Sequence, residues 1–115
     1  MTKELSRIIK AFGYSFAGLR AAWGEAAFRT EIFVCAVAVP LVFFLTDTKI
    51  ERAIMIASVL LVLIVELLNT GIEDAINRVS REFHPIAKRA KDVASAAVLL
   101  AIVNAIVVWS LILWS

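Results

Sequence analysis

Three apolar segments dominate the chain, and each is predicted to be a helix that crosses a membrane. They are Ile32 to Leu45, Ala53 to Val65 and Val93 to Trp114. A spanning helix needs about 20 mostly apolar residues, and the third segment alone has this length without charges. The first two can span only if their flanks at Glu31 and around Glu66 lie near the membrane boundary. With these flanks included, the expected spans are 29–46, 50–77 and 90–114.

The N-terminal stretch has apolar residues at three- and four-residue steps, which indicates a helix with one apolar face. These residues are Leu5, Ile8, Ile9, Phe12, Phe16, Leu19 and Trp23. Its basic residues Lys3, Arg7, Lys10 and Arg20 occupy other faces. A basic amphipathic helix lies along an anionic membrane surface. We therefore predict a surface helix over residues 3–25, with a soluble helix packed on a partner as the alternative.

The connections favour a wholly helical fold. Thr46 to Glu51 is short and polar, as expected for a turn between antiparallel helices. The charged stretch from Asn77 to Asp92 is predicted to be a longer connection. Proline disfavours helix in the residue before it, so a break is expected at His84-Pro85. The predicted fold class is an all-α membrane protein, with residues 1–115 forming a single integral-membrane domain.

Composition and charge support a bilayer location and give an orientation. Hydrophobic residues make up 62% of the chain, compared with roughly 45–50% in soluble domains. Lys and Arg number five before the first span, two in the first loop, five in the second loop and none after the third span. The positive-inside rule then places the N-terminus and second loop in the cytoplasm. Trp109 and Trp114 are interpreted as interfacial anchors. The single cysteine, Cys35, is interpreted as a packing residue.

A polar stripe at the end of the second span is the strongest candidate for chemistry. Glu66, Asn69, Glu73 and Asn77 fall within a wedge of roughly 80° on a helix. Glu66 and Glu73 are two turns, about 10 Å, apart along the axis. Carboxylates are costly to bury in hydrocarbon, so the stripe is expected to face another helix or a water-filled site. The alternative is hydrogen bonding across an oligomer interface.

Further charges are expected at the same depth as the stripe and suit phosphoryl transfer. Glu25, Arg29 and Glu31 precede the first span, and KRAKD at 88–92 precedes the third. Phosphoryl transfer needs oxygen ligands for Mg²⁺, cations for the phosphates and a base for the attacking hydroxyl. Gly13 and Gly18 have Walker A spacing but lack the Lys and Ser/Thr that should follow. No nucleic-acid partner is expected.

Four segments resemble the small prokaryotic diacylglycerol kinases. They are RIIKAFGYSFAGLRAAW (7–23), EAAFRTE (25–31), VELLNTGIEDAINR (65–78) and RAKDVASAAV (89–98). The resemblance implies ATP-dependent phosphorylation of diacylglycerol to phosphatidic acid. It also implies a homotrimer in the bacterial inner membrane, with active sites shared between neighbouring subunits and facing the cytoplasm.

The resemblance also implies roles for individual residues. Glu66 would be the general base, Asn69 would support it, and Glu25 and Glu73 would hold Mg²⁺ with the ATP phosphates. Further contacts to ATP would come from Arg7, Tyr14, Glu82, Phe83, His84, Lys91 and Asp92. The lipid substrate would contact Arg7, Phe12, Gly13, Tyr14, Ser15, Phe16, Arg20, Ala21, Ala22, Trp23, Ala27, Phe28, Arg29, Thr30, Glu31, Arg52, Glu66 and Ser95.

The chain departs from the family pattern at three positions, and two other functions stay open. Asn77 stands where an aspartate is familiar, Phe16 where a tryptophan is, and Lys88 where a glycine is. None of these is the proposed base or a metal ligand, so activity is expected to survive. One alternative is an undecaprenol kinase of the same family. A more remote one is an ion or proton pathway subunit, although the third span holds no acid to continue such a path.

Overall fold

The computed structural model describes residues 2–114, and this part of the chain folds into four helices, as the all-helical prediction required. They are α1 (Thr2–Ala22), α2 (Ala26–Leu45), α3 (Lys49–Val79) and α4 (Pro85–Leu113). Helices α2, α3 and α4 are each long and apolar enough to cross a membrane. Each extends beyond the uncharged core of its apolar segment, so polar residues that flank the segments are also helical.

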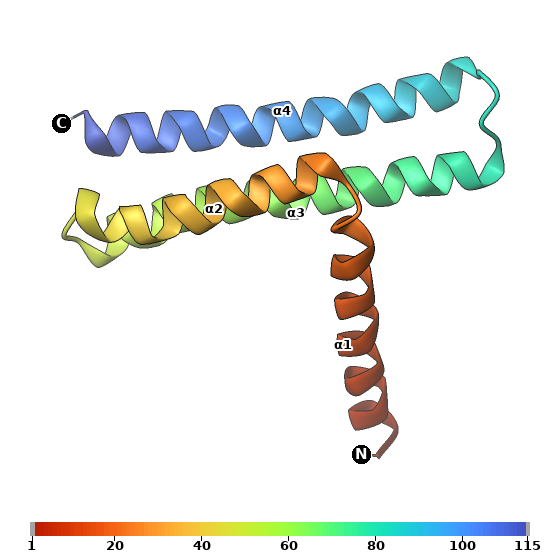
Figure 1. The fold of residues 1–115 in the computed structure, drawn as a ribbon, viewed down its shortest axis with the longest axis horizontal. Coiled ribbons are helices and arrows are strands. Elements are labelled where there is room, and N and C mark those ends of the chain that lie inside the picture. Colours follow the sequence, from red (N-terminus) through yellow and green to blue (C-terminus); the bar gives the residue numbers. More distant parts are fainter. Residues whose placement is uncertain (1, 115) are drawn as a thin grey trace.

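Helix α3 is the centre of the arrangement. It packs against both α2 and α4, and the three form an elongated bundle from which α1 turns away (Figure 1). The chain extends over 49 × 45 × 22 Å. Helix α1 contacts α3 near the start of α2. The junction of α1 and α2 therefore lies beside the part of α3 that carries the polar stripe.

The α1–α2 junction is a tight turn around Gly24. The Gly24 amide donates to the Ala21 carbonyl at 3.1 Å, and the Glu25 amide donates to the Ala22 carbonyl at 2.8 Å. A Cβ atom at position 24 would lie 3.2 Å from the Ala21 carbonyl oxygen. This close approach favours glycine. The Arg29 guanidinium donates to the Trp23 carbonyl at 2.8 Å and closes the turn from the other side.

The α2–α3 turn is held by hydroxyl and carboxylate groups. The Thr48 side chain caps α3 by accepting from the Glu51 amide at 3.3 Å, and its hydroxyl donates to the Glu51 carboxylate at 2.8 Å. The Thr46 hydroxyl donates to the same carboxylate. The Arg52 Nε donates to the Thr46 carbonyl at 2.9 Å. These contacts resemble a capping box, in which a threonine and a glutamate three residues later stabilise a helix start.

The α3–α4 connection is shorter than the sequence indicated. Helix α3 continues to Val79 and α4 begins at Pro85, so both ends of the expected Asn77–Asp92 connection are helical. The predicted break at His84-Pro85 is confirmed. His84 caps α4 through Nδ1, which accepts from the Ile86 amide at 3.1 Å, and Pro85 occupies the first turn, where its missing donor costs nothing.

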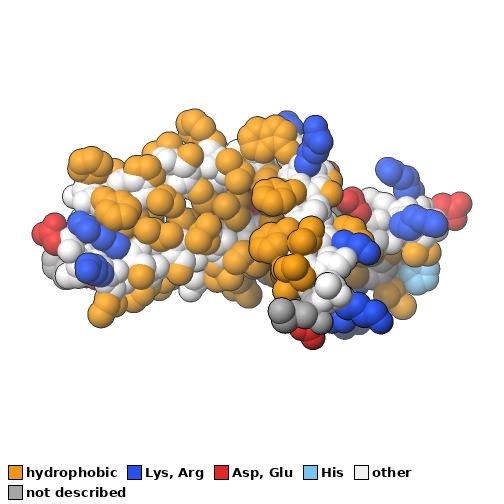
Figure 2. All heavy atoms as spheres, turned by 90° about the horizontal axis from the view of Figure 1, so that it is seen from below, with side chains coloured by type: hydrophobic (Ala, Val, Ile, Leu, Met, Phe, Trp, Pro, Cys, Tyr) orange, Lys and Arg blue, Asp and Glu red, His pale blue; other side chains and the backbone are white. Residues whose placement is uncertain are grey.

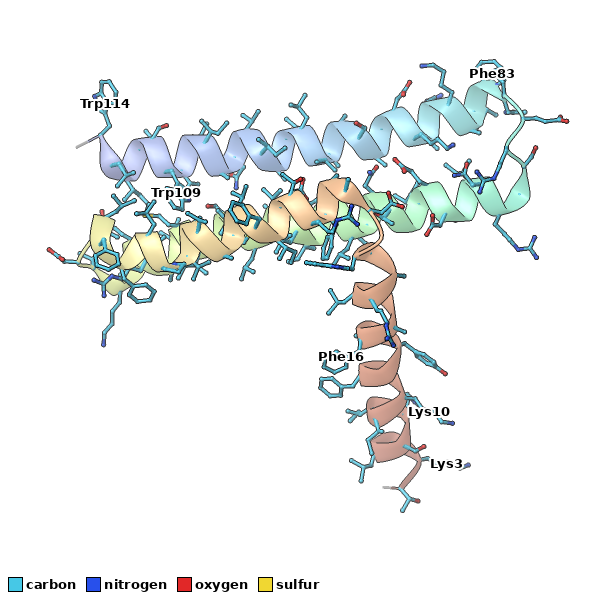
Figure 3. The ribbon with its side chains drawn as sticks, in the orientation of Figure 1. Lys3, Lys10, Phe16, Phe83, Trp109 and Trp114 are labelled. Carbon is cyan, nitrogen blue, oxygen red and sulfur yellow. The ribbon has the colours of Figure 1, made fainter. Side chains whose placement is uncertain are left out.

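Trp109 is half-buried and faces α3, in contrast to its interpretation as an interfacial anchor. Its indole Nε1 donates to the Ser58 hydroxyl at 3.1 Å and to the Met55 carbonyl at 3.3 Å. Figure 3 shows Trp109 between α4 and its neighbours, whereas Trp114 points away from the bundle. A buried indole N–H needs an acceptor, and the buried Ser58 supplies one. Trp109 therefore ties α4 to α3.

Most large apolar side chains of the bundle are exposed within one chain. The buried apolar residues are Ala22, Phe28, Val42, Met55, Val59, Ala94 and Ala101. Figure 2 shows hydrophobic side chains spread over the bundle, with charged side chains gathered toward its two ends and along α1. Exposed apolar surface on this scale marks a membrane or protein contact. The three long apolar helices make lipid the natural surrounding.

Candidate functional site

Three carboxylates lie within electrostatic range of Glu66, where the α1–α2 junction lies beside α3. Glu66 on α3 is 6% exposed. It interacts electrostatically with Glu73, two turns further along α3. It also interacts with Glu25 at the start of α2 and with Glu31 on α2. Four predicted site residues, Glu25, Glu31, Glu66 and Glu73, are thus brought into one region by the fold. Like charges this close need a cation or protons nearby to coexist.

The polar stripe faces protein, as its spacing predicted. Glu66 is buried, while Asn69, Glu73 and Asn77 are half-buried. On the other side of the same helix, Leu68 is exposed. The stripe is therefore oriented toward the neighbouring helices of the bundle.

Asn69 is hydrogen-bonded to the second carboxylate of the stripe. Its amide Nδ2 donates to Glu73 Oε1 at 3.2 Å. Its carbonyl Oδ1 is buried without a hydrogen-bond partner, and so is Oε2 of Glu31. An unsatisfied buried polar atom costs about 1–3 kcal/mol. Two such atoms beside Glu66 mark a place where substrate, water or a cation would be favourable.

The end of the stripe meets the basic start of α4. The Lys91 ammonium donates to Asn77 Oδ1 at 2.7 Å. One turn away, Lys88 and Asp92 form an exposed ion pair at 2.6 Å. An open hollow of about 310 Å³ lies between the ends of α3 and α4. Five predicted ATP-contacting residues line it, namely Glu82, Phe83, His84, Lys91 and Asp92.

A second hollow, of about 510 Å³, separates α1 from α3. The predicted lipid-contacting residues Ser15, Ala21 and Ala22 line one side. Thr70 and Asp74 of α3 line the other side. The sequence analysis did not select Thr70 and Asp74, because they lie outside the polar stripe. Only the position of α1 in the fold shows that they face a hollow.

The first two-thirds of α1 stands apart from the carboxylates. Arg7 makes no ion pair with another residue in 2–114, and Tyr14 is 73% exposed. Phe16 projects from α1 into open space (Figure 3). The other predicted lipid contacts on α1, Phe12, Gly13 and Arg20, are exposed as well. Within residues 2–114, no hydrogen bond or ion pair joins any of these residues to Glu66.

The remaining predicted lipid contacts divide between the site and the far end of the bundle. Glu31 interacts electrostatically with Glu66. The other members of this group lie at the α1–α2 junction or in the first turns of α2, where Phe28 is buried and Trp23, Ala27, Arg29 and Thr30 are exposed. Ser95 is exposed on α4. Arg52 lies in the first turn of α3, where it donates to the Thr46 carbonyl and stacks over the Phe43 ring at 5.0 Å. It is 14 residues from Glu66 on α3, or about 21 Å along the axis. The fold does not bring Arg52 to the other candidates.

The donor set at the carboxylates suits Mg²⁺. Within residues 2–114, no three side chains of His, Cys, Asp or Glu converge as a metal cage. Mg²⁺ seldom uses such a cage and is usually bound by one or two carboxylates completed by phosphate oxygens and water. Glu25 makes no capping hydrogen bond through its side chain, and Glu73 has one oxygen engaged by Asn69. Both retain free lone pairs for a cation.

Comparison with known proteins identifies the family. The model of the family described as prokaryotic diacylglycerol kinase matches residues 13–113. The diacylglycerol kinase of Escherichia coli strain K12 is 50% identical, over 99% of this chain and 94% of its own. The diacylglycerol kinase of Pseudomonas aeruginosa is 51% identical over 95% of this chain and 89% of its own. The diacylglycerol kinase of Haemophilus influenzae is 44% identical over 98% of this chain and 97% of its own. This chain belongs to the prokaryotic diacylglycerol kinase family.

Proposed function

We propose that the protein transfers the γ-phosphoryl group of ATP to diacylglycerol and so produces phosphatidic acid at the membrane surface. The observation that carries the proposal is the buried Glu66, which lies among Glu25, Glu31 and Glu73 beside two unsatisfied polar atoms. The relatives named above are diacylglycerol kinases. Burying an acidic side chain in a membrane-spanning helix costs free energy, so such a residue is a candidate for a functional role.

Glu66 is the proposed general base. It takes the proton of the diacylglycerol hydroxyl as that oxygen bonds to the γ-phosphorus of ATP. The bond from this phosphorus to the β,γ-bridging oxygen breaks, and ADP leaves. Asn69 holds Glu73 through its amide, and its unsatisfied Oδ1 faces the same buried region. It is therefore suited to orient either the base or the incoming hydroxyl.

Glu25 and Glu73 are the proposed ligands of Mg²⁺, which would neutralise charge on the phosphate oxygens. Lys91 would supply a cation to the same phosphates, because its ammonium lies at the end of the stripe. Glu82, Phe83, His84 and Asp92 would contact the remainder of ATP, since they line the hollow beside Lys91.

The proposed assembly is a homotrimer in the inner membrane with a cytoplasmic N-terminus. The Lys and Arg distribution of five, two, five and none supports this orientation. The exposed apolar faces of α2 and α4 support contacts with lipid and other copies. Helix α1 extends away from its own bundle (Figure 1), so Arg7 and Tyr14 would reach the site of a neighbouring subunit.

Lipid specificity is tested by phosphoryl transfer in mixed micelles. The purified protein is given labelled γ-phosphate on Mg-ATP, with diacylglycerol and undecaprenol in parallel. We expect label chiefly in phosphatidic acid. Label chiefly in undecaprenyl phosphate would retain the site and change the substrate. No label in either lipid from folded protein would refute the kinase function, and ion flux in liposomes would then test the pathway alternative.

A further inference from the structure

The contact between Asn77 and Lys91 joins two helices at the edge of the proposed nucleotide site. Lys91 Nζ donates to Asn77 Oδ1 at 2.7 Å across 14 residues of chain, and both side chains are half-buried. We propose that Asn77 is a positioning residue, which holds the Lys91 ammonium toward the ATP phosphates while leaving its positive charge uncompensated. This inference rests on the proposed function.

The chemistry of the acceptor supports this role. A lysine ammonium is a point charge with three N–H donors on a flexible stem. An amide oxygen accepts one of these donors without supplying a negative charge. The other two donors and the full charge then remain for phosphate oxygens. A carboxylate in the same place would hold the ammonium but would also attract and partly compensate its charge.

The neighbouring acid on α4 is already engaged. Asp92 follows Lys91 directly, but its carboxylate pairs with Lys88 at 2.6 Å. Lys91 is therefore held by an uncharged acceptor, Asn77, while Asp92 forms its ion pair with Lys88. Both Lys91 and Asp92 line the hollow of about 310 Å³, so the ammonium borders open space that phosphate oxygens can enter.

The position along α3 places the ammonium near the proposed metal ligand. Asn77 follows Glu73 by four residues, so the two side chains are neighbours on one helix face. Glu73 would hold the cation on the phosphates, and Lys91 contacts Asn77 one turn further along the same face. Free Lys91 would sample many rotamers, whereas the Asn77 contact fixes it on the face that Glu73 occupies.

The contact is not needed to hold α3 and α4 together. The same two helices are joined by the hydrogen bond from Trp109 to Ser58 at the other end of the bundle. Buried Met55, Ala94 and Ala101 add apolar packing within this pair of helices. Loss of the Asn77 acceptor is therefore expected to change nucleotide binding more than folding.

The test compares four purified proteins: the unchanged chain, Asn77→Ala, Asn77→Asp and the matched control Asn104→Ala, whose side chain is exposed on α4. The KM for Mg-ATP, the KM for diacylglycerol and kcat are measured in mixed micelles. Loss of a hydrogen bond to a charged group predicts that Asn77→Ala raises the KM for ATP at least about tenfold. We expect kcat and the KM for diacylglycerol to change less than twofold, and Asn104→Ala to match the unchanged chain.

Two further comparisons separate positioning from a general structural effect. Asn77→Asp keeps an acceptor, so its KM for ATP should lie between those of the unchanged chain and Asn77→Ala. In a Lys91→Met background, Asn77→Ala should weaken ATP binding no further, as measured by equilibrium dialysis of labelled Mg-ATP, which needs no turnover. An unchanged KM for ATP in Asn77→Ala would overturn the inference. So would a loss of ATP binding from Asn77→Ala that is as large in the Lys91→Met background as in the unchanged chain. If the unchanged chain transfers no phosphate, the proposed function fails instead.

Discussion

Trp109→Phe removes the indole donor that α4 shares between two acceptors on α3. The substitution keeps an aromatic ring at the helix contact and removes the indole donor that reaches Ser58 and Met55. Ser58 remains satisfied, because its hydroxyl still donates to the Met55 carbonyl at 2.6 Å. No buried acceptor is therefore left without a partner, and the penalty is the net value of the lost bond.

The expected loss is about 0.6–1 kcal/mol of unfolding free energy, because hydrogen bonds between membrane helices average about 0.6 kcal/mol and seldom exceed about 1.7. Unfolding by sodium dodecyl sulfate in mixed micelles, followed by circular dichroism, measures this difference. Trp114→Phe is the matched control, since Trp114 is 88% exposed and should change stability by less than about 0.5 kcal/mol.

The activity of folded Trp109→Phe should equal that of the unchanged chain. Ser58 is eight residues from Glu66 on α3, which corresponds to about 12 Å along the axis. Equal stability of Trp109→Phe and the unchanged chain, or an equal loss in Trp114→Phe, would refute the assignment of Trp109 as an internal tie.

Three further predictions concern a cap, the core and the metal ligand. Thr48→Ala removes the α3 cap and should cost about 1 kcal/mol in the same unfolding assay, whereas Thr2→Ala at the exposed start of α1 should cost less. Met55→Ala empties a fully buried position and should cost about 2–5 kcal/mol; a loss below that of Thr48→Ala would contradict the packing described. Glu73→Gln should raise the Mg²⁺ concentration needed for half-maximal transfer at least about tenfold, and an unchanged Mg²⁺ titration would exclude Glu73 as a ligand.

The helices and the polar stripe were predictable because their signals are local. Hydrophobic length marks a span without reference to neighbours. The spacing of Glu66, Asn69 and Glu73 defines one face from helix geometry alone. His84-Pro85 marks a helix boundary through the covalent constraints of proline. None of these inferences needs knowledge of which helices pack together.

The contacts between helices were not predictable in the same way. The interpretation of Trp109 followed its position near the end of a span, but its partner depends on how α4 is aligned with α3. The tether between Asn77 and Lys91 depends on the same alignment. The charged ends of the expected Asn77–Asp92 connection proved helical, because charged side chains at helix ends are readily solvated and do not interrupt the backbone hydrogen bonds.

Arg52 received its role from the resemblance alone. The resemblance places it with the lipid contacts, and within one chain it lies in the first turn of α3 against Thr46 and Phe43, so its lipid contact stays a prediction. Arg7 and Tyr14 show the complementary case, because a single chain leaves them far from the carboxylates and a neighbouring subunit would be needed to bring them there.

The central claim is that Glu66 is the base of a phosphoryl transfer, and Glu66→Gln tests it most directly. Glutamine keeps the size of the side chain and removes its ability to take a proton. Transfer of labelled phosphate from Mg-ATP to diacylglycerol should fall about 10²–10⁴-fold in kcat, the usual contribution of a general base. The matched control Glu4→Gln, on the exposed first turn of α1, should leave the rate within twofold. A folded Glu66→Gln protein that transfers phosphate at the rate of the unchanged chain would contradict the account.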